Sequence, residues 1–200
     1  MSVRLTLLCA AAGPSVRGEA RFGGGSLDER AVHEAEAARS ALPAAPVVLR
    51  APSVRCGQTA DALGLDASVE PRLRDLDHGS WQGRSLTEVL AGVGPEAGPE
   101  AVRQWTTDPA AAPHGGESVR ELCLRIGGWL DSLPGDLPQD TGRRVLAVVE
   151  PSVVRAAGVY ALGAPLPAFW RLDVPPLSGI GLTWHGGRWN LRLVATAPTA

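Results

Sequence analysis

Two carboxylates and one guanidinium have the types and positions needed for acid–base chemistry on a small molecule. Glu150 directly follows the apolar run 145–149, Asp75 lies in a predicted extended segment, and Arg55 opens a predicted helix after the apolar run 47–49. If the two carboxylates face each other across a cleft, their repulsion raises one pKa and creates an acid beside a base. We therefore expect Glu150 and Asp75 to be catalytic and Arg55 to bind substrate.

Glu150 and Cys9 each have a second interpretation. A carboxylate at a helix start can cap that helix or pair with an arginine, here Arg55 or Arg155. Cys9 ends the first apolar run, where a thiol near Arg55 and a helix N-terminus could have a lowered pKa and act as a nucleophile. Cysteine is also among the most commonly buried residues, so ordinary core packing is the alternative.

Four further residues are candidates for binding a substrate. His78 lies in the same segment as Asp75, and His114 lies in a loop among proline and glycines, where a histidine is commonly just exposed. Trp105 could form a hydrophobic lid over an aromatic ligand or simply pack the loop onto the body. Arg21, in a glycine-rich loop, could add a cation to the site.

The order of the predicted elements indicates how these residues are positioned. Apolar runs alternate with amphipathic segments, which predicts an α/β fold: a three-layer α/β/α sandwich with a mostly parallel central sheet and helices on both faces. Stretches 179–184 and 189–193 flank a glycine turn and predict a C-terminal β-hairpin. Open sheets of this kind bind ligands beyond the carboxyl ends of their strands, where the candidates lie.

Helices are predicted from capping boxes and helical spacing of apolar residues. The boxes begin at Ser26, Ser85 and Ser118, and the third helix should end before Pro134. Residues 1–200 are expected to form a single domain, with a loop-rich insertion at 91–113 that carries a short helix near 100–105.

Composition excludes several classes of function. The formal net charge is −2, so neither nucleic acid nor an anionic membrane is expected as a partner. All 19 basic residues are arginine, which removes lysine nucleophiles and Schiff bases. The three cysteines lack metal-ligand spacing, so we expect free thiols, a cytoplasmic location, no metal and no cofactor. The expected partner is a small molecule, either anionic or aromatic. The sequence does not decide between a monomer and a homodimer.

Five blocks of sequence carry recognisable motifs, at residues 21–29, 55–60, 73–83, 113–118 and 148–155. They include an Arg-x-x-Gln-Thr-Ala motif, an acid-bearing segment that ends in Gly-x-Trp-x-Gly, and a Pro-x-Gly-Glu-Ser segment with one extra glycine. Over nearly the whole chain, these blocks resemble the histidine phosphatase superfamily, also called phosphoglycerate mutase-like proteins. The resemblance implies the same three-layer fold and a phosphate pocket beyond the strand ends.

The resemblance also shows which parts of the family's chemistry this chain lacks. The family's nucleophilic histidine falls on Ala10, the arginine before it on Cys9, and its second histidine on Glu150. Its phosphate-binding arginine and its proton donor are retained as Arg55 and Asp75. Because alanine cannot accept a phosphoryl group and Glu150 replaces a cation by an anion, we expect no phosphohistidine chemistry and weak phosphate binding.

Three hypotheses follow for this divergent site. The favoured one is a repurposed small-molecule enzyme that uses acid–base catalysis, such as cyclisation, dehydration or hydrolysis, in the old phosphate cleft. The alternative is a non-catalytic pseudo-phosphatase that acts as a binding or partner-interaction module. Residual phosphatase activity is the least favoured. A deep, closed cleft that contains Glu150, Asp75 and Arg55 favours an enzyme, and a filled or collapsed cleft favours a non-catalytic scaffold.

Overall fold

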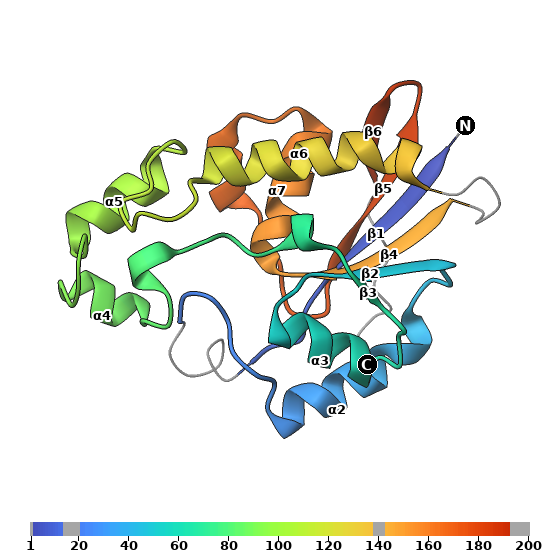
Figure 1. Ribbon diagram of the computed structural model, residues 1–200, viewed down its shortest axis with the longest axis horizontal. Coiled ribbons are helices and arrows are strands. Elements are labelled where there is room, and N and C mark those ends of the chain that lie inside the picture. The colour runs from blue at the N-terminus through green and yellow to red at the C-terminus, as the bar shows by residue number, and fades with distance from the viewer. Residues whose placement is uncertain (1, 14–20, 138–142, 193–200) are drawn as a thin grey trace.

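A six-stranded sheet forms the centre of the computed structural model, which describes residues 2–13, 21–137 and 143–192 (Figure 1). The strand order is β3-β2-β4-β1-β5-β6; the pairs among β1 to β4 are parallel, and β5 and β6 are antiparallel additions. The strands are β1 (Val3–Cys9), β2 (Val47–Arg50), β3 (Ser68–Val69), β4 (Arg144–Val149), β5 (Gly179–His185) and β6 (Arg188–Arg192). The predicted hairpin is confirmed as β5–β6, with position 193 outside the described residues.

The two central strands are apolar because both faces of the sheet are covered. In β1 and β4 the apolar side chains are all buried, and their parallel register places Leu5 beside Val145 and Leu7 beside Ala147. Continuous apolar runs, rather than alternating ones, are typical of such strands.

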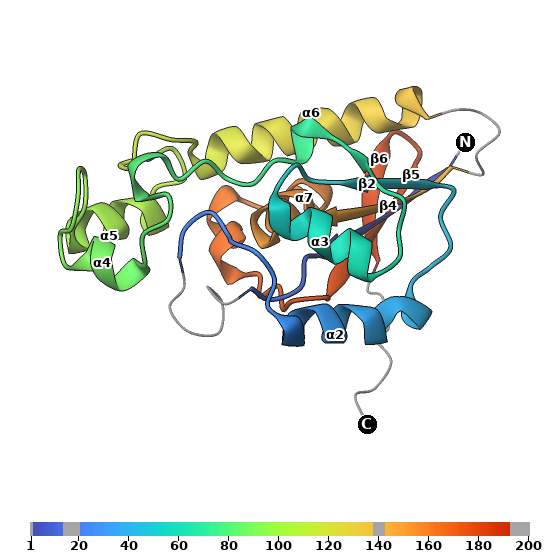
Figure 2. The same cartoon turned by 60° about the horizontal axis from the view of Figure 1, so that its bottom comes forward.

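Helices cover the sheet on both sides, which confirms the three-layer α/β prediction. Helices α2 (Glu29–Ala38) and α3 (Val54–Ala62) lie below the strands in Figure 1, and α6 (Val119–Asp136) and α7 (Pro151–Leu162) lie on the other side, as Figure 2 also shows. No helix among the described residues is long and apolar enough to cross a membrane. Short 3₁₀ segments connect these elements: η1 (Arg39–Ala41), η2 (Pro71–Leu73), η3 (Gly79–Trp81) and η4 (Leu166–Arg171).

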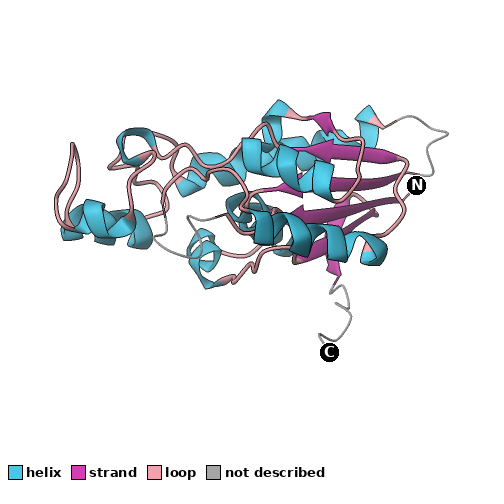
Figure 3. Cartoon of the chain, turned by 90° about the horizontal axis from the view of Figure 1, so that it is seen from below, coloured by secondary structure: helices cyan, strands magenta, loops and turns pink. Residues whose placement is uncertain are grey.

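The two short helices α4 (Leu86–Leu90) and α5 (Pro99–Thr107) extend beyond one end of the sheet (Figure 3). Strands β1, β2 and β4 point their carboxyl ends toward this extension (Figure 1). The helix predicted near 100–105 is therefore present as α5.

Local capping explains where the helices start. The predicted capping boxes at Ser85 and Ser118 are confirmed: each hydroxyl accepts the N–H of the glutamate three residues on, whose carboxylate accepts the serine N–H. The predicted box at Ser26 is wrong. Asp28 caps α2 instead, because its carboxylate accepts the Ala31 N–H at 2.7 Å.

The prediction that α6 ends before Pro134 is also wrong. Proline at this position removes the hydrogen bond to the carbonyl four residues earlier, which belongs to Leu130. That carbonyl accepts the indole N–H of Trp189 from β6 at 3.1 Å instead. The freed acceptor is therefore satisfied from a distant strand, and the helix continues to Asp136.

Candidate functional site

The carboxyl ends of three neighbouring parallel strands bring the candidate residues together. The Ala10 N–H bonds the Val149 carbonyl and the Ala51 N–H bonds the Val148 carbonyl, both at 2.9 Å, so the chain leaves β1, β2 and β4 side by side. Glu150 follows β4 at this edge, and Arg55 lies in the first turn of α3. The expected grouping at one edge of the sheet is present.

Glu150 forms a buried ion pair with Arg55. The Arg55 Nη2 group bonds Glu150 Oε2, and Arg55 Nε lies 3.4 Å from Oε1. The Ser53 hydroxyl donates to the same Oε1 at 2.7 Å, and the Cys56 thiol lies 3.6 Å from it. The Glu150 side chain is 0% exposed and that of Arg55 8%, so both charges are satisfied inside the protein.

This geometry decides between the interpretations of Glu150. The side chain does not cap α7, although its backbone occupies the N-cap position. Arg155 is directed elsewhere, because its Nε group donates to the Leu172 carbonyl at 2.8 Å. Pairing with Arg55 is therefore the arrangement present. Ser53, which the sequence reasoning missed, caps α3 in the short loop that follows β2, and this position was the signal that could have found it.

Asp75 is held close to this pair on the segment after η2. Its Oδ1 atom accepts the Ser152 hydroxyl at 2.5 Å and the Leu76 N–H at 2.8 Å. Burial, and then the nearby Glu150 carboxylate, raise the pKa of Asp75 to about 6. The expected coupling of two carboxylates is thus present, with Asp75 as the group whose pKa rises.

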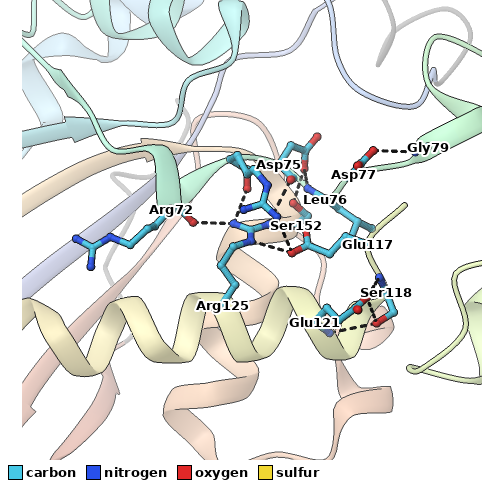
Figure 4. A network of polar contacts seen from close by, with 11 residues as sticks. Arg72, Asp75, Leu76, Asp77, Gly79, Glu117, Ser118, Glu121, Arg125 and Ser152 are labelled. Carbon is cyan, nitrogen blue, oxygen red and sulfur yellow. Dashed lines mark hydrogen bonds and ion pairs between the residues drawn. The ribbon is translucent and has the colours of Figure 1, made fainter. Parts of the chain in front are cut away.

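A second, partly buried ion pair, between α6 and its N-terminal loop, fixes the segment that carries Asp75 (Figure 4). Arg125 binds both oxygens of Glu117, at 2.8 and 2.6 Å, and donates to the carbonyls of Arg72, Arg74 and Asp75 at 2.6–3.3 Å. Sequence reasoning missed Arg125, since its helical position gives no sign of these carbonyls. The guanidinium positions the acid through the backbone.

Positions 9 and 10 are closed to solvent. Ala10 is 3% exposed, and the next N–H, of Ala11, donates to the Thr59 hydroxyl at 3.1 Å. Burial, and then Glu150, raise the pKa of the Cys9 thiol to about 12. This direction is opposite to the lowered pKa that a thiolate nucleophile requires. Cys9 is also 1% exposed, which supports its core-packing interpretation.

The two histidines and Trp105 lie in one aromatic cluster. His78, His114 and Trp105 pack with Trp81 and Phe22 at centroid distances of 5.0–6.1 Å. His114 is 1% exposed, which contradicts the alternative of a merely exposed loop histidine. Burial, and then His114, lower the pKa of His78 to about 4, and burial also lowers that of His114. Both imidazoles are therefore neutral at pH 7, and Trp105 packs the extension onto the body.

Arg21 lies at the base of the extension. It donates to the Gly83 carbonyl at 2.9 Å and lies 3.8 Å from the Glu88 carboxylate. The glycine loop that follows passes beside Arg55: a side chain at Gly24 would meet the guanidinium at 3.9 Å. Among residues 2–13, 21–137 and 143–192, no cluster of three or more His, Cys, Asp or Glu is placed to hold a metal ion.

A mixed sheet covered by helices on both faces, with a polar site beyond the carboxyl ends of its parallel strands, defines a doubly wound α/β protein. A sequence profile of the histidine phosphatase superfamily (branch 1) matches residues 19–197. The chain belongs to this superfamily.

Named phosphatases are among the similar proteins. Phosphoserine phosphatase 1 of Hydrogenobacter thermophilus is 30% identical over 114 residues, 56% of this chain and 50% of the relative. Glucosyl-3-phosphoglycerate phosphatase of Mycobacterium tuberculosis is 31% identical over 134 residues, which cover 63% of this chain and 56% of the relative. The chain thus spans about half the length of these curated relatives. The solved structure of a mycobacterial glucosyl-3-phosphoglycerate phosphatase, complexed with VO3, superposes on this chain with a TM-score of 0.80 and 26% identity. The superposition covers 96% of this chain and 98% of the phosphatase.

Proposed function

We propose that this chain is a pseudo-phosphatase, a histidine phosphatase domain whose anion site is closed by its own Glu150 carboxylate. The observation that carries the proposal is the complete burial of Glu150 in its ion pair with Arg55. In the family, the cation at position 55 binds phosphate. Here an internal carboxylate is already bound to that cation.

Two physical reasons argue against phosphoryl transfer at this site. The side chain of Ala10 has no lone pair with which to attack phosphorus. A phosphate dianion at Arg55 would also have to displace Glu150 or lie beside it, and like charges at a few ångströms in a poorly hydrated site repel each other by several kcal/mol. Position 10 and the ion pair are nearly closed to solvent, which supports a site that an external anion cannot readily enter.

Acid–base catalysis on a small molecule is the second candidate function, and Asp75 is the observation that favours it. Asp75 as a whole residue is half-buried, the raised pKa of its carboxyl keeps it partly protonated near pH 6, and Ser152 orients it. Such a group could donate a proton to an anionic or aromatic ligand, in the cytoplasmic setting that we expect.

A gain-of-function experiment tests the proposal. We compare the wild type with the variant Cys9→Arg/Ala10→His/Glu150→His, using an aryl phosphate at matched protein concentration. The wild type should show no turnover above buffer. The triple variant regains a nucleophile and two cations, and should exceed the wild type by at least about 100-fold, the size of the contribution that such groups make.

Two controls make the result interpretable. Asp75→Asn in the triple variant should lower the regained turnover, because the leaving aryloxide loses the acid that protonates it. Circular dichroism and the urea midpoint show whether the variant is folded, and the double variant Ala10→His/Glu150→His serves if arginine at position 9 prevents folding. Aryl phosphate turnover by the wild type that disappears in Asp75→Asn would overturn the proposal and support a phosphatase.

A further inference from the structure

A cavity lies at the amino ends of the parallel strands, at the opposite end of the sheet from the strand-end site. Its volume is about 290 Å³, and it is lined by the starts of β1 and β4, by parts of β5 and β6, and by the chain between η1 and β2. Arg4 of β1 lines this cavity, whereas Cys9 at the other end of β1 belongs to the strand-end site. The strand between them is about 17 Å long, so the two sites are separate.

The charged residues that line this cavity are all cationic. They are Arg4, Arg144 and Arg192, from three different strands, and no acidic residue lines the cavity. All three arginines are exposed, and none forms an ion pair with an acidic group within 2–13, 21–137 and 143–192. Because the whole chain has a formal net charge of −2, this local excess of positive charge is not a general property of its surface.

The strand register places the three arginines on one face of the sheet. Arg4 lies directly opposite Arg144 across the parallel β1–β4 pair. Two residues along β1, Thr6 lies opposite Gly181 of β5, which in turn lies opposite Arg192 of β6. Opposite residues, and residues two apart on a strand, have side chains on the same face. The guanidiniums therefore approach the cavity from two sides, and Gly181 adds no side chain to the space between them.

This arrangement is unfavourable for the chain alone. Like charges held opposite each other on neighbouring strands repel, and Arg4 and Arg144 are such a pair. Next to Arg4 across the β1–β5 pair, the Thr183 hydroxyl is buried without a hydrogen-bond partner in the part of the chain that the structure describes. Buried polar groups are normally satisfied. An anion bound among the guanidiniums would turn their repulsion into attraction.

We propose that this cavity binds a small organic diphosphate, with one phosphate group between Arg4 and Arg144 and the other at Arg192. The guanidinium fork matches phosphate oxygens bidentately, and two linked phosphates provide charge for both sides of the cavity. A volume near the lower end of the range for ligand sites, about 300–1,000 Å³, excludes a large polyanion. The wall at 41–45 contributes small apolar residues, which suit a small organic group.

Calorimetric titration with inorganic pyrophosphate, without divalent cations and at constant ionic strength, tests this site. The wild type should bind one pyrophosphate per chain. Inorganic phosphate should bind at least about tenfold more weakly, because it can reach only one side of the cavity. The single variants Arg4→Gln, Arg144→Gln and Arg192→Gln should each raise the dissociation constant of pyrophosphate at least about tenfold, as expected when a charged hydrogen bond is lost.

Matched variants separate this site from general electrostatics and from the strand-end site. Arg103→Gln removes the same charge from the exposed face of α5 and should not change the dissociation constant. Without ligand, Arg4→Gln and Arg144→Gln should be at least as stable to urea as the wild type, because each relieves the repulsion; weaker binding is then not a result of unfolding.

Four results would each overturn the proposal. They are a wild type that does not bind pyrophosphate, phosphate binding as tight as that of pyrophosphate, binding unaffected by all three cavity variants, and an equal loss in Arg103→Gln. Loss of pyrophosphate binding in Arg55→Leu/Glu150→Leu, with the cavity variants unaffected, would place the anion at the strand-end site instead.

Discussion

Replacing Glu150 by glutamine should destabilise the protein strongly, although the two side chains have almost the same shape. Glutamine keeps an oxygen that can accept the Ser53 hydroxyl, so the main change is the loss of one negative charge. The Arg55 guanidinium, 8% exposed, is then left without its counter-charge. Removing one partner of a buried ion pair costs about 3–5 kcal/mol. For a chain of this size that lowers the thermal midpoint by about 6–20 °C.

Urea unfolding followed by circular dichroism measures this cost, with two matched variants. Glu100→Gln removes one partner of the exposed pair Glu100–Arg103 on α5, and should leave the midpoint almost unchanged. Arg55→Leu/Glu150→Leu removes both buried charges at once and should be more stable than Glu150→Gln, since an apolar pair leaves no charge unpaired. A Glu150→Gln variant within about 1 kcal/mol of the wild type would refute the reasoning.

The same site should accept an external anion once the carboxylate is removed. In Glu150→Ala, inorganic phosphate can occupy the vacated space beside Arg55. Phosphate at 100 times its dissociation constant should then stabilise the variant by about 2.7 kcal/mol. The wild type should show no such gain at the same phosphate concentration. Equal stabilisation of both proteins would mean that the internal carboxylate does not block anion binding.

Three further predictions concern other parts of the molecule. Because the pKa of Cys9 is raised to about 12, native protein at pH 8 should not react with a thiol reagent until it unfolds, and rapid labelling of Cys9 would contradict this. The pKa of His78 is near 4 in the folded protein and 6.5 in the unfolded chain, so the free energy of unfolding should fall as pH falls from about 6.5 to 4. In urea titrations across this pH range, His78→Phe should lose about 3 kcal/mol less than the wild type. An equal loss in both proteins would argue against a buried neutral imidazole. Gly79→Ala should lower the urea midpoint more than Gly83→Ala. Both glycines have positive φ, but only at Gly79 would the added methyl meet a backbone oxygen, that of His114, at 2.1 Å. Equal urea midpoints for the two variants would contradict this packing.

Several features of the fold could be predicted because they depend on local physics. Buried parallel strands require unbroken apolar runs, so β1 and β4 were recognisable from the runs of apolar residues in the sequence. Capping boxes at Ser85 and Ser118 are satisfied within four residues and were predicted correctly. The end of α6 was not, because the carbonyl freed by Pro134 finds its partner in Trp189, which lies far along the chain.

The features of the candidate site likewise fall into those that the sequence predicted and those that it did not. The sequence by itself determined the family, the expected edge of the sheet, and the absence of a histidine at positions 10 and 150. Only the tertiary structure decided that Glu150 turns toward Arg55 rather than capping α7. It also decided that Cys9 has a raised pKa, since burial depends on every segment packed around the thiol. Residue types and spacing specify which groups reach an edge of the sheet, but desolvation and pairing, which set their charge, are properties of the assembled core.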